Sequence, residues 1–137
     1  LLERLPATVS LAVAAMVVAL AVAFPLGIYA ATHHGRLSDT VVRIASQVGV
    51  SVPDFWLGIV FILVFSVTLG WLPPSGYVPI TEDPLGWLER VTMPALAVGL
   101  VSGAILTRFV RSAVLESLGS DHARTARAKG LRRRVVL

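Results

Sequence analysis

Three long stretches of this sequence carry no charged residue, and they constrain the fold more than any other feature. They run from Leu5 to Thr32, from Phe55 to Thr81 and from Met93 to Thr107. A helix needs about 20 mainly apolar residues to cross a bilayer. The first two stretches are long enough, and residues 91–110 reach that length if Arg108 extends to the membrane interface.

The composition agrees with a membrane location. Hydrophobic residues make up 55% of the 137 residues and charged residues only 15%, against roughly 25% charged residues in soluble domains. Backbone polar groups must be satisfied internally within lipid, which favours helices. The sequence therefore predicts an all-α membrane protein.

We expect the spans at about residues 7–31, 40–69 and 91–112. The second span is expected to break near Pro53, which cannot donate a backbone hydrogen bond. Asp54 follows the break, where it can cap the second half of the span. An acidic residue at this depth is alternatively a candidate for lining a transport pathway.

Local signals add smaller elements at the ends of these spans. Ser38 is a suitable N-cap for a helix that has Asp39 in its first turn. Leu85–Arg90 is expected as a short interfacial helix. Pro94 fits the first turn of the third span, since proline is favoured at the first position of a helix.

Small residues recur every fourth position in the first and third spans. This spacing favours close approach of another helix backbone, although it also arises from alanine richness alone. The predicted packing residues are Ala19, Ala23 and Gly27 in the first span, and Ala95, Gly99 and Gly103 in the third.

Positive charge is concentrated at one end of the chain. Eight of the twelve Lys and Arg residues lie between Arg108 and Arg134, so the tail after the third span is expected to be cytoplasmic. Arg36 and Arg43 place the first connection on the same side. The second connection, which contains Glu82, is then external.

A short helix is expected at about 121–129 in this tail, with Ser120 as its N-cap and Gly130 after it. Ala123, Ala126 and Gly130 would share one face, where small side chains allow a partner to dock closely. The alternative is a basic juxtamembrane segment that fixes topology and touches anionic lipid.

Four stretches together resemble the permeases of ABC importers, in particular the branch that imports dipeptides, oligopeptides, nickel or glutathione. The tail resembles their coupling segment, although Arg124-Thr125-Ala126 replaces the more general Glu-Ala-Ala and His122 stands where this branch usually has an aromatic residue. The stretches are Leu5–Thr8, Ser51–Gly58, Gly70–Tyr77 and Ala123–Leu131. Both ends of the chain look cut, so we expect about three helices of a six-span core.

The resemblance implies a division of labour among subunits. Such permeases pair with a second permease, two cytoplasmic ATPases and an extracytoplasmic solute-binding protein, in the cell (inner) membrane of a bacterium or archaeon. The residues implied in ATPase coupling are Ala123, Arg124, Thr125, Ala126, Arg127, Ala128, Lys129 and Gly130. No phosphate-binding loop is present, so ATP and magnesium are expected in the partner ATPase, with no cofactor here.

Other chemistry finds little support in the sequence. His33 and His34 are adjacent and lack further ligands at metal-binding spacing, and no nucleophile–base pair suggests an enzyme. Two alternative functions stay open. One is a fragment of an ATP-independent secondary transporter, and the other is a membrane anchor whose basic tail binds lipid or nucleic acid.

Overall fold

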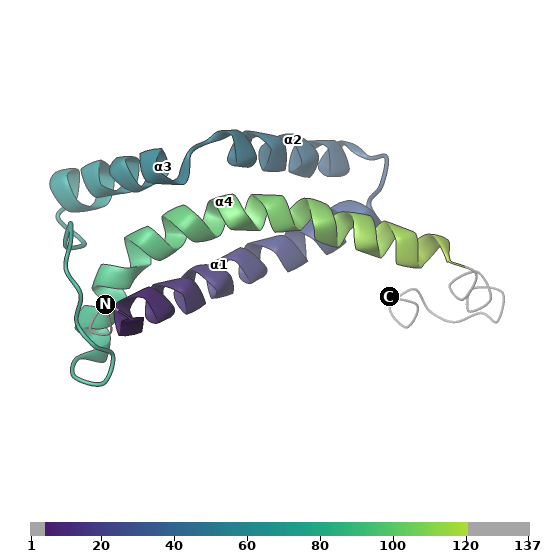
Figure 1. The fold of residues 1–137 in the computed structure, drawn as a ribbon. Helices are drawn as coiled ribbons and strands as arrows, with labels where there is room; N and C mark the ends of the chain where they lie inside the picture. The colour runs from purple at the N-terminus through teal and green to yellow at the C-terminus, as the bar shows by residue number, and fades with distance from the viewer. Residues whose placement is uncertain (1–4, 121–137) are drawn as a thin grey trace.

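The computed structural model describes residues 5–120, which form helices joined by short turns and one longer loop, with no strand in that range. The helices are α1 (Leu5–Thr32), α2 (Leu37–Ser51), α3 (Asp54–Phe61), a π-helical segment η2 (Ile62–Thr68) and α4 (Pro84–Gly119) (Figure 1). The protein is thus an all-α membrane protein, as its sequence predicts.

Two of the helices are long and apolar enough to cross a membrane. These are α1 and α4, and a third span is added if α2 and the α3–η2 segment are counted together. Large apolar side chains cover the outside of α1, where Val9, Val13 and Val17 are all more than half exposed. An apolar surface of this kind needs lipid or further protein against it.

The α1 helix continues through its internal proline, Pro25. Its small residues point inward instead of outward, since Ala15, Ala19 and Ala23 are each at most 6% exposed. Near its start, the Ser10 hydroxyl donates to the Ala7 carbonyl at 3.0 Å. This bond pairs the Ser10 hydroxyl with a carbonyl oxygen of the same helix.

A sharp break separates α2 from α3 at the position where the sequence places it. Val52 and Pro53 are extended, with ψ of 123° and 135°, as the steric effect of proline on its predecessor requires. The two helical pieces are bent by 91°, so they form either a broken span or a re-entrant loop.

The start of α4 differs from the expectation. One helix runs from Pro84 through Pro94, so residues 85–90 are not a separate element and Pro94 lies inside the helix. The start is set earlier by Asp83, whose Oδ1 accepts from the Gly86 amide at 3.0 Å, and by Pro84 in the first turn. These two signals together begin the helix before Pro94 is reached.

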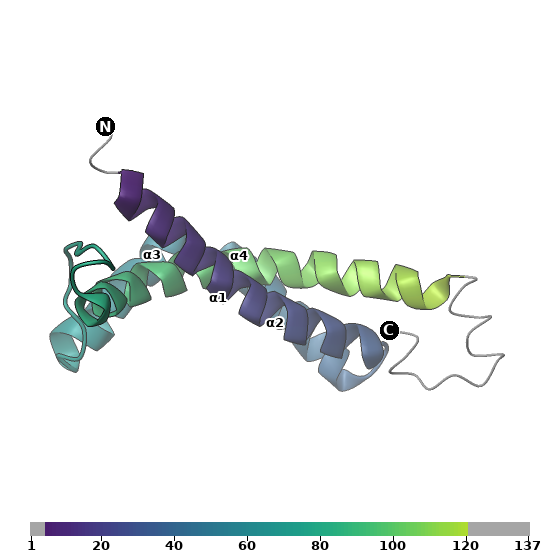
Figure 2. The same cartoon turned by 90° about the horizontal axis from the view of Figure 1, so that it is seen from below.

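The helices lie in two layers. Figure 1 shows α1 and α4 running side by side in the same direction, with α2 and α3 along one side of them, and Figure 2 shows α1 crossing α4 at an angle. The turn at residues 33–36 and the end of α4 therefore lie at one end of the bundle. The loop at residues 69–83 lies at the other.

Candidate functional site

The seam between α1 and α4 brings the two backbones into contact. A Cβ added at Gly99 would lie 2.6 Å from Val18 Cβ and 2.8 Å from the Ala15 carbonyl oxygen. A Cβ added at Gly103 would lie 3.2 Å from the Ala19 carbonyl oxygen. The glycines of α4 therefore allow a closer approach than any other residue would.

A third glycine serves the same seam from the α1 side. A Cβ at Gly27 would meet Val110 Cγ1 at 2.7 Å and the Thr107 carbonyl at 3.0 Å. The Thr107 side chain is 1% exposed, and its hydroxyl donates to the Gly103 carbonyl at 2.7 Å. The remaining packing residues expected from the sequence are also buried, namely Ala19, Ala23 and Ala95.

The contact of α2 with α4 uses a glycine that sequence reasoning missed. A Cβ at Gly49 would lie 2.8 Å from the Ala104 Cβ. In contrast, a Cβ at Gly58 in α3 would meet only ordinary contact, with Ala97 at 3.9 Å. Ala45 lies four positions before Gly49, but Val41 and Pro53 stand at the next positions of that spacing, so the signal is one pair only.

An ion pair closes the end of the bundle where α1 turns into α2. The Arg111 Nε atom donates to Asp39 Oδ1 at 2.7 Å, and Arg111 Nη2 donates to Asp39 Oδ2 at 2.9 Å. The Asp39 side chain is 2% exposed and that of Arg111 is 16% exposed. Bidentate pairing of this kind fixes geometry as well as charge.

The turn before α2 completes the surroundings of this carboxylate. The Gly35 amide donates to Asp39 Oδ2 at 3.1 Å, and Gly35 has a φ of 79° that favours glycine. His34 Nδ1 lies 3.1 Å from Asp39 Oδ2 and 3.0 Å from Arg111 Nη2. Since one ring nitrogen holds either a proton or a lone pair, it bonds to only one of these at a time.

The N-cap of α2 differs from the one expected from the sequence. Arg36 occupies the N-cap position without a side-chain cap, and Ser38 lies inside the helix. Asp39 lies in the first turn of α2, as expected, and its carboxylate also bonds to Arg111 near the end of α4 and to the preceding turn.

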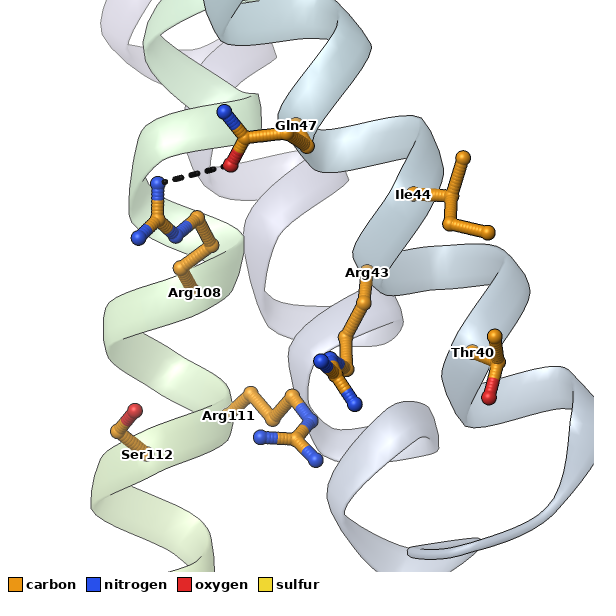
Figure 3. Close-up of a pocket in the computed structure, with 7 residues that line it drawn as sticks. All are labelled: Thr40, Arg43, Ile44, Gln47, Arg108, Arg111 and Ser112. Carbon is orange, nitrogen blue, oxygen red and sulfur yellow. Dashed lines mark hydrogen bonds between the residues drawn. The ribbon is translucent and has the colours of Figure 1, made fainter.

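A groove with a basic lining lies beside this ion pair, between α2 and α4. The volume of this open groove is about 440 Å³. Figure 3 shows Arg43 of α2 and Arg111 of α4 extending toward each other across it, while Arg108 donates to the Gln47 amide oxygen at 3.5 Å. The lining residues are Thr40, Arg43, Ile44, Gln47, Arg108, Arg111 and Ser112.

Asp54 lies at the break before α3, exposed and away from these features. Pro53 takes the N-cap position, and Asp54 is the first helical residue, with Oδ1 accepting from the Phe55 amide at 2.7 Å. The carboxylate therefore serves the start of α3 from one position later than expected.

The described part of the chain shows no candidate metal site. Within residues 5–120, no group of three or more His, Cys, Asp or Glu side chains gathers in a way that could hold an ion. His33 Nδ1 instead lies 2.9 Å from the Tyr29 carbonyl oxygen.

The expected coupling segment, Ala123–Gly130, lies outside the described residues. The structure does show what leads to it. The α4 helix continues to Gly119, and the Ser120 hydroxyl donates to the Ser117 carbonyl at 2.7 Å. The packed interior of the bundle is thus joined to the tail by continuous helix.

Comparison with known proteins decides the family. Residues 23–137 match the family described as "Binding-protein-dependent transport system inner membrane component". The chain belongs to this family. Its relatives match it along almost its whole length.

The relatives carry peptide-transport names. A putative peptide transport system permease protein of Brucella abortus is 44% identical over 98% of this chain and 43% of its own length. A di/tripeptide permease of Pseudomonas aeruginosa is 37% identical over 95% of the chain and 45% of its own length. An oligopeptide permease of Bacillus subtilis is 33% identical, covering 100% and 44%. The chain thus spans less than half the length of these permeases.

Proposed function

We propose that this chain forms part of the translocation path of an ATP-driven importer for peptides or a related small solute. The observation that carries the proposal is the family match over residues 23–137, with relatives named as peptide permeases. The spans would supply half of the path, and a second permease subunit would supply the rest.

The energy for transport would come from another chain. The sequence has no Gly-x-x-x-x-Gly-Lys-[Ser/Thr] loop, and Lys129 is its one lysine. We therefore assign ATP and magnesium to two partner ATPase subunits. Substrate would arrive from a solute-binding protein, as the family description implies.

Charge supports a cytoplasmic position for the tail, in a bacterial or archaeal cell membrane. Arg36 and Arg43 lie at the same end of the bundle as Arg108 and Arg111, while the opposite connection carries Glu82 and Asp83. The excess of arginine marks the cytoplasmic side.

The geometry also supports a route for coupling. A displacement of residues 121–130 by an ATPase would act on the end of α4 at Gly119. The seam at Gly99 and Gly103 would carry that movement to α1. The Asp39–Arg111 pair would carry it to the α1–α2 turn, because tightly packed interfaces move as units.

Bulky residues in the tail of the full-length permease test this function. Ala126→Trp or Gly130→Trp should reduce co-purification of the ATPase subunits and uncouple ATP hydrolysis from transport. Ala113→Trp is the matched control, since Ala113 is an exposed alanine of α4 that precedes the coupling segment. Membrane insertion should be unchanged in all three.

If ATPase co-purification survives both Ala126→Trp and Gly130→Trp, the tail is not the docking segment. Equal loss with Ala113→Trp would mean that bulk near the end of α4 disturbs assembly in general, which also contradicts a specific docking segment.

A further inference from the structure

A second cavity, lined mainly by apolar residues, adjoins the basic groove between α2 and α4. This second cavity is about 370 Å³ and shares Arg108 and Ser112 with the first. Its other lining residues are Val50, Ile105 and Phe109. Val50 lies further along α2 than Thr40, so the apolar part extends from the arginines toward the middle of the spans.

Two of the groove's arginines keep their charge available. Asp39 is occupied by Arg111. Within residues 5–120, neither Arg43 nor Arg108 forms an ion pair with a carboxylate, and the bond from Arg108 goes to the neutral amide of Gln47. Two guanidinium groups beside one cavity favour an anionic occupant.

The apolar lining of the second cavity favours a phospholipid over a small soluble anion. Phe109 is 68% exposed and Ile105 is 41% exposed on a helix long enough to cross a membrane. A small soluble anion would leave this surface uncovered, whereas a phospholipid covers it with an acyl chain. Basic pockets between membrane helices are known to hold acidic headgroups.

We propose that this groove binds one anionic phospholipid at the α2–α4 interface. Its phosphate lies in the groove that Arg43 and Arg108 line, and the Ser112 side chain lines the same groove. One acyl chain runs along Ile105 and Phe109. A bound lipid would fill the groove beside the Asp39–Arg111 pair and so support the end of α4.

Native mass spectrometry of the full-length permease complex tests this binding. Phosphatidylglycerol and phosphatidylethanolamine with identical acyl chains are titrated separately, and the first bound lipid is measured. We expect the wild type to bind phosphatidylglycerol more tightly. Soluble glycerol phosphate should fail to displace it, because the soluble compound lacks the acyl chain.

Three arginine variants identify the site. Arg43→Gln and Arg108→Gln should each weaken the first phosphatidylglycerol by about fivefold, the effect expected for one cation near an acidic headgroup. Arg108→Lys should keep most of the preference. Arg36→Gln is the matched control, because it removes one exposed charge at the same end of the bundle but does not line the groove.

Several results would overturn the proposal. One is equal binding of the two lipids by the wild type, as when a protein segment fills the groove. Another is an equal loss with Arg36→Gln, which would indicate a general effect of surface charge. Displacement by glycerol phosphate would show a soluble-anion site instead. If a glutamine variant fails to assemble, Arg108→Lys and Arg36→Gln still decide, since loss of the preference in Arg108→Lys contradicts the charge-based site.

Discussion

Arg111 near the end of α4 holds Asp39 at the start of α2 through two hydrogen bonds, of 2.7 and 2.9 Å, across 72 positions of sequence. This pair fixes the α1–α2 turn to the helix that leads to the tail. The Asp39 side chain is only 2% exposed. A buried carboxylate requires its partner, so loss of this contact costs stability.

Removing Arg111 should therefore destabilise the protein. Arg111→Met leaves Asp39 buried without its counter-charge, which costs about 3–5 kcal/mol when a buried pair is broken from one side. Unfolding of the full-length permease in mixed micelles of increasing dodecyl sulfate content measures this loss. Arg36→Gln, an exposed control, should change stability by less than about 0.5 kcal/mol.

The double variant Asp39→Asn with Arg111→Met gives a sharper test of the pairing. Because it leaves no unpaired charge, it should recover part of the stability lost in Arg111→Met. Strictly additive losses from Asp39→Asn and Arg111→Met would show that the two side chains do not depend on each other.

Gly99 should tolerate no side chain. Gly99→Ala places a methyl group 2.6 Å from Val18 Cβ and 2.8 Å from a backbone oxygen of α1, so we expect a loss of about 1–3 kcal/mol. Gly58→Ala is the matched control, because its nearest neighbour is 3.9 Å away and alanine favours helix. Thermal stability in detergent should fall for Gly99→Ala and hold or rise for Gly58→Ala. The reverse order would contradict the seam.

The orientation of the spans can be read with reporter fusions. A reporter placed after Gly119 should score as cytoplasmic, and one placed at Pro79 should score as external, since arginine gathers at the first position and acidic residues near the second. Alkaline phosphatase and green fluorescent protein give complementary signals. A cytoplasmic score at Pro79 would require the membrane topology to be redrawn.

Sequence alone predicted two features that depend on local sterics and on helical spacing. Pro53 marks the break in the second span because its effect on Val52 is steric and local. The alanine and glycine spacing also identified residues that the structure buries, because helical periodicity converts spacing directly into a face.

Features that depend on tertiary contacts could not be predicted from local sequence patterns. The partner of Asp39 is distant in sequence, so the aspartate was interpreted from its helix position alone. Pro94 resembled a helix start, yet the capping by Asp83 and the packing of α4 against α1 keep the helix continuous through it. An arginine within a long apolar helix, facing an acidic helix start, was the signal that could have identified the ion pair.

Uptake of a labelled peptide into proteoliposomes tests the central claim most directly. The full-length permease is reconstituted with the second permease and the ATPases proposed for it, and the proposed solute-binding protein is added outside. We predict that uptake requires ATP within the lumen, where the ATPases lie, together with the binding protein outside. Uptake driven by a proton or sodium gradient without ATP would contradict the account and indicate a secondary transporter.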